Sequence, residues 1–121
     1  MYSTGKLFLI LLSLVYGCTK NNENCIKARV VRISCAGIVV QVLNQDSLGD
    51  YGWRDVSSNI VYNNVFSVKN TCDIGTRYKG EEIYFSLRNT PAVNECISCM
   101  MFDAPPRKSF LIENVTRKHC K

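Results

Sequence analysis

Seven cysteines in a chain of 121 residues constrain the fold more than any other feature of this sequence. They are Cys18, Cys25, Cys35, Cys72, Cys96, Cys99 and Cys120. Cysteine spacing of this kind in a small exported chain is typical of a disulfide framework. An odd count leaves one thiol over once the others have paired. The sequence leaves the connectivity open.

The N-terminus has the features of an export signal. Lys6 and the chain amine supply positive charge, residues 7–15 are apolar apart from Ser13, and Gly17 is the small residue expected before a cleavage point. The apolar run is too short to cross a bilayer, which takes about 20 apolar residues. We therefore predict a signal peptide over residues 1–17 and a mature chain that begins at Cys18.

Residues 15–18, Val-Tyr-Gly-Cys, resemble the lipobox of bacterial lipoproteins, with Tyr16 in place of the usual small residue. The resemblance implies that the Cys18 thiol is diacylated, which also accounts for the unpaired cysteine. It implies outer-membrane placement too, because Thr19 stands where inner-membrane lipoproteins commonly carry aspartate. The alternative is ordinary signal cleavage after Gly17, which leaves Cys18 free or paired between chains.

The predicted domain organisation is simple. A diacylated Cys18 would hold the protein stably on a membrane, because each buried methylene contributes about 0.8 kcal/mol. Residues 18–24 are polar after the cysteine and are predicted to form a tether. Residues 25–121 are predicted to form one disulfide-rich β domain, since about 100 residues suit a single domain.

Strand-like patterns dominate this domain. Runs rich in β-branched and aromatic residues predict five strands, at residues 28–33, 38–43, 61–68, 82–88 and 108–115. In the fourth, Ile83, Phe85 and Leu87 alternate with polar positions and are expected to share the buried face. Residues 44–59 form the longest loop, with room for a short helical turn. The prediction is a mainly β, OB-like Greek-key barrel of five strands stapled by disulfides; the alternative is a small β-sandwich.

Two motifs suggest a redox-active thiol pair and a zinc site, and the sequence favours neither. Cys96 and Cys99 have the spacing of a redox pair, but Pro105 and Pro106 interrupt the helix that would lower a thiol pKa, so structural disulfides are favoured. With His119 and Cys120 they form a poor zinc set, because adjacent residues seldom bind one ion together. No hydrolase motif is present. We predict no enzymatic activity, no metal and no cofactor.

The net charge of +5 arises from dispersed basic residues, a pattern usual for a solvated surface. OB barrels bind oligosaccharides or oligonucleotides on one face. Arg29, Arg88 and Arg107 are expected to share such a face with Tyr84. Tyr51 and Trp53 in the long loop are candidates for stacking on a sugar, although Trp53 capping an open barrel end is the favoured interpretation. For an exported protein we expect a glycan, lipid headgroup or envelope protein as partner, and no nucleic acid.

The leading hypothesis is a non-catalytic lipoprotein of the cell envelope that presents a small β-barrel for binding or for a structural role. One alternative is an extracytoplasmic thiol-disulfide oxidoreductase that uses Cys96 and Cys99. Another is a soluble secreted inhibitor-like module on a netrin-type OB barrel, which requires Cys18 to be unlipidated.

Overall fold

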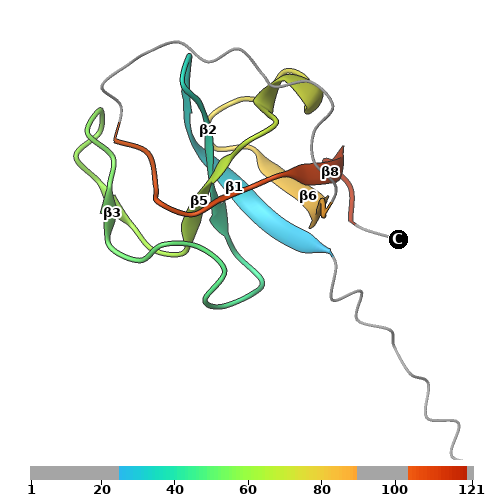
Figure 1. Cartoon of the computed structure of the whole chain (residues 1–121), viewed down its shortest axis with the longest axis horizontal. Coiled ribbons are helices and arrows are strands. Elements are labelled where there is room, and N and C mark those ends of the chain that lie inside the picture. Colours follow the sequence, from blue (N-terminus) through green and yellow to red (C-terminus); the bar gives the residue numbers. More distant parts are fainter. Residues whose placement is uncertain (1–24, 90–103, 120–121) are drawn as a thin grey trace, which may run out of the picture.

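The computed structural model describes residues 25–89 and 104–119, and these residues are almost entirely strand and loop (Figure 1). The elements are β1 (Ile26–Ser34), β2 (Gly37–Val42), β3 (Trp53–Arg54), β4 (Val61–Tyr62), β5 (Val65–Val68), the short 3-10 helix η1 (Thr71–Asp73), β6 (Glu82–Leu87), β7 (Ser109–Phe110) and β8 (Ile112–Thr116). Within these two stretches, no helix has the length and apolarity needed to span a bilayer. The prediction of a mainly β protein is confirmed.

One curled sheet forms the body of the molecule, with the strand order β7-β5-β2-β1-β6-β8. β1 pairs antiparallel with both β2 and β6, and β2 pairs antiparallel with β5. The turn between β1 and β2 places Gly37 at a φ of 138°, a conformation that glycine adopts without steric cost. β3 and β4 form a separate two-stranded ribbon.

The C-terminal segment reaches both edges of this sheet. β7 pairs in parallel with β5 at one edge, and β8 pairs antiparallel with β6 at the other. Only Leu111 separates β7 from β8 in the chain. A single short segment can satisfy both edges only if the sheet curls, and Figure 1 shows this half-barrel shape.

The main core fills the inside of the curl. It combines side chains from β1, β2, β5, β6 and β8, all less than 9% exposed. Phe66 lies at its centre, with ring centroids 6.0 Å from Phe85 and 5.0 Å from Phe110 in edge-on contacts. Ile83 and Phe85 point inward as predicted, and Leu87 packs against the same cluster. Burying each such side chain contributes about 1.5–3 kcal/mol.

A second, smaller cluster lies on the other face of the sheet. Val31, Val39 and Val65 are buried there beneath Trp53 and Tyr62 of the β3–β4 ribbon. The predicted interpretation of Trp53 as a cap on an open barrel end is therefore wrong, because its ring packs on the outer face of β1, β2 and β5. The ribbon protects this face of the sheet from water.

Two of the predicted strands need correction. The strand expected at 61–68 is interrupted at residues 63–64, because Asn64 has a φ of 59° and leaves the extended conformation. The strand expected at 108–115 divides at Leu111 as it passes from one sheet edge to the other. The loop at 44–59 contains β3 and, at residues 56–58, a turn closed by the Asn59 N–H, which donates to the Asp55 carbonyl at 2.8 Å; this is the i→i+4 bond of a single helical turn, for which the sequence left room.

Cys25, Cys35 and Cys72 are each held in a disulfide. The remaining cysteines, Cys18, Cys96, Cys99 and Cys120, lie outside the described residues. The pairing and the number of bridges stay predictions.

Candidate ligand-binding hollow

A hollow of about 420 Å³ lies where the loop before β3 meets the segment that leads into β7. Its lining gathers aromatic rings and guanidinium groups: Asp50, Tyr51, Gly52, Trp53, Arg54, Ala104, Pro105 and Arg107. Three of the residues predicted as a ligand surface, Tyr51, Trp53 and Arg107, therefore meet at one place. The sequence placed Tyr51 and Trp53 in one loop but did not predict that Arg107 lies beside them.

Backbone hydrogen bonds hold the first wall of the hollow. The Asp50 N–H donates to the Val65 carbonyl at 2.7 Å, and the Val65 N–H donates back at 3.0 Å. The Gly52 N–H donates to the side-chain oxygen of Asn63 at 2.9 Å. A Cβ on Gly49 would lie 2.4 Å from the Val65 nitrogen, so the chain can approach β5 this closely only with glycine at that position.

A buried asparagine supports the same loop from below. The Asn64 side-chain oxygen accepts the N–H groups of Leu48 and Gly49 at 3.1 and 2.7 Å. Its amide group donates to the Gln45 carbonyl at 2.6 Å. These bonds satisfy backbone groups that would otherwise be left without partners in a tight loop. Asn64 had no role in the sequence predictions.

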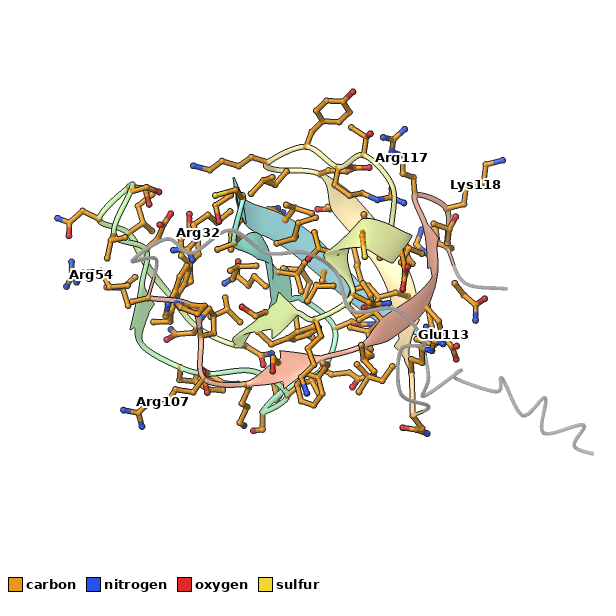
Figure 2. All side chains as sticks on the ribbon, turned by 45° about the horizontal axis from the view of Figure 1, so that its top comes forward. Arg32, Arg54, Arg107, Glu113, Arg117 and Lys118 are labelled. Carbon is orange, nitrogen blue, oxygen red and sulfur yellow. The ribbon has the colours of Figure 1, made fainter. Side chains whose placement is uncertain are left out.

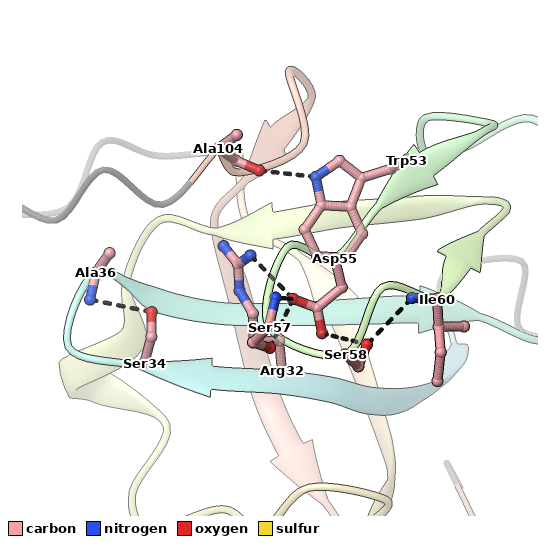
Figure 3. Close-up of polar contacts among 9 residues, drawn as sticks. All are labelled: Arg32, Ser34, Ala36, Trp53, Asp55, Ser57, Ser58, Ile60 and Ala104. Carbon is pink, nitrogen blue, oxygen red and sulfur yellow. Dashed lines mark hydrogen bonds and ion pairs between the residues drawn. The ribbon is translucent and has the colours of Figure 1, made fainter.

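The second wall is tied to the first by two further bonds. The Trp53 indole N–H donates to the Ala104 carbonyl at 2.8 Å (Figure 3). The Lys108 N–H donates to the Asp50 carboxylate at 3.0 Å. Together these contacts fix residues 104–108 against residues 50–53, although more than fifty positions separate them in the chain.

A buried ion pair stabilises the base of the ribbon. Arg32 on β1 approaches the Asp55 carboxylate at 3.4 Å, with 7% and 0% of the two side chains exposed. The Arg32 guanidinium also lies over the Trp53 ring, 4.8 Å from its centroid. Figure 3 shows the arginine, the carboxylate and the indole together at this point. Trp53 is thereby held on one face by a cation–π contact.

Asp55 also organises the ribbon turn. Its carboxylate accepts hydrogen bonds from the Ser57 N–H and hydroxyl at 3.1 and 2.8 Å and from the Ser58 hydroxyl at 2.9 Å. Burial by itself raises the pKa of Asp55, but the bonds from Ser57, Ser58 and Arg32 outweigh it and lower the pKa below its usual range. Asp55 therefore stays ionised, and its role is structural.

Tyr51 is the exposed aromatic surface of the hollow. Tyr51 is 57% exposed, yet its hydroxyl accepts a hydrogen bond from the Ser47 N–H at 3.0 Å. The ring is thus held at its tip and accessible on its faces. An aromatic ring fixed before binding loses less conformational entropy when a ligand stacks on it.

The charges around the hollow favour an anion. Arg54 is held by a hydrogen bond to the Asn59 side chain at 2.9 Å, and it has no ion-pair partner within residues 25–89 and 104–119. Arg107 is exposed and likewise has none there. Figure 2 shows both guanidinium groups on the ribbon side of the molecule, pointing outward. Among the lining residues that the structure describes, Asp50 is the single carboxylate, so the two arginines give this part of the lining a net positive charge.

The other three candidate residues lie elsewhere. Arg29 pairs with Glu82 at 3.0 Å on the neighbouring strands β1 and β6. Tyr84 is only 8% exposed, because His119 packs on its ring at a centroid distance of 4.7 Å, so the expectation of an accessible Tyr84 is wrong. Arg88 pairs with Asp73 at 3.8 Å.

A larger hollow of about 600 Å³ surrounds Arg88 and Arg77. Both cations there have carboxylate partners, Asp73 for Arg88 and Glu81 for Arg77, at 3.8 and 3.3 Å. Their positive charge is already neutralised within the protein. The hollow beside Tyr51 is therefore the better candidate for a charged ligand.

Several predicted site residues cannot be placed. The lipid-attachment candidate Cys18 and the motif formed by Cys96 and Cys99 lie outside the described residues, as does Cys120. In residues 25–89 and 104–119, no group of three or more histidine, cysteine or acidic side chains is arranged to hold a metal ion.

No known family model matches the chain, and no curated protein matches its sequence.

Proposed function

We propose that this protein is a non-catalytic lipoprotein of the cell envelope, held to the membrane through acyl chains on Cys18, whose β domain presents a binding surface outside the cytoplasm. The observation that carries the proposal is the hollow itself. An exposed tyrosine is held there by its hydroxyl and an exposed arginine by Asn59, and a second exposed arginine, Arg107, lies in the same lining. Such a surface suits recognition of a glycan or an envelope protein.

The anchor part of the proposal is supported by the sequence. Cys18 follows an export signal in a lipobox-like context, and residues 19–24 contain no apolar side chain. Six extended residues reach about 20 Å at roughly 3.3–3.6 Å each. A tether of this length would leave the domain free to present its surface away from the lipid. The proposed location is the outer membrane.

The proposed fold is an OB-like Greek-key barrel of five strands with three disulfides. It is supported by the pairing of β1, β2, β5 and β6 with a C-terminal segment that contacts both β5 and β6. If β7 and β8 are counted as one bent strand, five strands form a curled, partly open barrel, which resembles the OB-fold. The disulfides of Cys25, Cys35 and Cys72 support the stapling.

Lipidation is tested by expressing the chain with its own signal peptide in a Gram-negative host fed an alkyne-tagged palmitate. We expect the protein to carry the tag and to sediment with membranes. Cys18→Ser should abolish the tag and release the protein into the soluble fraction, because the thiol is the only proposed acylation site on the side chains. Thr19→Ser, next to the anchor, is the matched control and should behave like the parent chain.

Two results would overturn the proposed anchor. Untagged parent protein, or Cys18→Ser protein that stays tagged and membrane-bound, would exclude an anchor on Cys18. Soluble parent protein with Cys18 in a disulfide would favour the secreted inhibitor-like alternative.

A further inference from the structure

We propose that the hollow formed by Tyr51, Trp53, Arg54 and Arg107 binds an acidic oligosaccharide, one whose sugar rings carry carboxylate groups. This inference deepens the proposed function and rests on it for the expectation of an extracytoplasmic ligand. It names the class of ligand that the chemistry of the hollow fits.

The hollow offers an aromatic surface on which a sugar ring can pack. Sugar rings present a face of C–H groups, and an accessible aromatic face is the natural surface for them to pack against. Tyr51 offers such a face, since its residue is 57% exposed while its hydroxyl is held by the Ser47 N–H. Trp53 is half-buried, with its indole N–H occupied by the Ala104 carbonyl, and forms the floor beside it.

The hollow also offers two guanidinium groups that can bind carboxylates. A guanidinium presents its N–H groups in a planar fork that matches both oxygens of a carboxylate. Arg107 has this fork exposed and without an ion-pair partner among the residues that the structure describes. Arg54 contributes a second guanidinium, positioned by the Asn59 side chain at 2.9 Å. The Asp50 carboxylate is engaged by the Lys108 N–H, so it opposes an incoming anion less than a solvent-exposed carboxylate would.

Hydrogen bonds make the walls of the hollow rigid. The walls of the hollow are joined by the Trp53–Ala104 and Asp50–Lys108 bonds, and the loop before β3 is paired with β5 through Asp50 and Val65. A preformed site loses little conformational entropy on binding, which favours an oligosaccharide that makes few contacts. A nucleic acid also carries anions and stacking rings, but an extracytoplasmic domain with dispersed charge favours the glycan.

The protein offers an internal probe, because Trp53 is its only tryptophan. The experiment titrates detergent-solubilised full-length mature protein with hexagalacturonic acid and follows tryptophan fluorescence, with isothermal calorimetry as a second readout. We expect saturable binding that weakens at high salt, because the interaction is between exposed charges. Neutral galactohexaose should bind at least about tenfold more weakly, because it lacks the carboxylates that form charged hydrogen bonds with the guanidinium groups.

Two variants and two matched controls test the residues. Tyr51→Ala and Arg107→Gln should each raise the Kd for hexagalacturonic acid about tenfold or more. Tyr78→Ala and Lys79→Gln remove an equally exposed tyrosine and a cation on another loop, and should leave the Kd unchanged. Normal circular dichroism of each variant shows that it is folded.

Three outcomes would overturn the proposal: no binding by either readout, equal affinity for the neutral hexamer, or tighter binding of a hexathymidylate. Equal affinity of Tyr51→Ala and Tyr78→Ala would also overturn it, since the ligand would then bind elsewhere. The lipidation assay is independent of this titration. An acylated protein that binds no hexamer contradicts this inference alone, whereas a binding protein without acyl groups contradicts only the anchor.

Discussion

At the scale of single residues, Arg32 shows how one irregularity creates a buried ion pair. Ile26, Ala28 and Val30 alternate into the main core, and strict alternation would place Arg32 there too. The register of β1 against β2 shifts between Val30 and Arg32, so that Arg32 lies opposite Val39. The bulge turns the arginine to the outer face, where Asp55 and Trp53 lie. A pattern of period two carries no sign of a bulge, so the sequence did not predict this pair.

Removing Asp55 should be severely destabilising. In Asp55→Ala the Arg32 guanidinium stays buried without its carboxylate, and the ribbon turn loses the bonds to Ser57 and Ser58. Breaking a buried pair from one side costs about 3–5 kcal/mol in free energy of unfolding. Urea denaturation under non-reducing conditions measures this cost.

Asp46→Ala is the control, because Asp46 is exposed in the neighbouring loop and should change stability by no more than about 0.5 kcal/mol. If the two alanine variants unfold at the same urea concentration, the ion pair contributes nothing to stability. It then does not hold the floor of the hollow rigid.

At the scale of elements, local pattern predicted the strands that continue without an interruption. β1, β2 and β6 match the predicted runs within a few residues, because apolar alternation and β-branched content act locally. The breaks within the other two predicted strands depend on distant partners. Asn64 leaves the extended conformation to bond the loop at 45–49, and β7 ends where the chain crosses from β5 to β6. Neither cause is visible in the run itself.

Asn70 illustrates the same limit. Its side-chain oxygen accepts the Ile112 N–H at 2.9 Å, and its amide donates to the Ile112 carbonyl at 2.6 Å. The side chain thus pairs with β8 as a neighbouring strand would. The local sequence gives no sign of this role, because the partner of Asn70 is forty-two positions away.

The carboxylate of Glu81 should make the free energy of unfolding depend on pH in the acid range. Glu81 precedes β6 and pairs with Arg77 at 3.3 Å and with Arg117 just after β8. Burial alone raises the pKa of Glu81, but Arg117, the Tyr78 N–H and Arg77 outweigh it and lower the pKa below the ordinary 4.5. The folded state therefore binds protons less readily than the unfolded state. The stabilisation is fully present above pH 4.5 and is lost as the pH falls through the lowered value.

The measurement is the unfolding midpoint between pH 7 and pH 2 for the parent protein and for Glu81→Gln. The variant should be less stable at pH 7 and should lose less stability on acidification, because one linked proton has been removed. Glu113→Gln, an exposed change on β8, should reproduce the parent curve. A Glu81→Gln curve parallel to the parent would show that Glu81 does not contribute to the acid dependence; Asp55, with its lowered pKa, would then account for it.

At the scale of the whole molecule, the sequence indicated three residues of the hollow but did not predict that all three lie together. Tyr51 and Trp53 stood out as aromatics in one loop, and Arg107 as a basic residue beyond the paired prolines. They meet because the C-terminal segment returns across the ribbon and bonds to it through Ala104 and Lys108. That return depends on the curl of the whole sheet. Sequence spacing alone therefore grouped Arg107 with Arg29 and Tyr84, which lie on β1 and β6.

The disulfide framework leads to a prediction for the whole chain. Of the seven cysteines, acylation of Cys18 would leave six, and Cys25, Cys35 and Cys72 are already in bridges. We expect the intact mass of protein alkylated without reduction to show acyl mass and no alkyl groups. After reduction, the same protein should take up six alkyl groups and unfold at a much lower temperature, since each disulfide stabilises by about 2–4 kcal/mol. Uptake of alkyl groups before reduction would mean that thiols remain free, and the redox alternative at Cys96 and Cys99 would then be favoured over a purely structural framework.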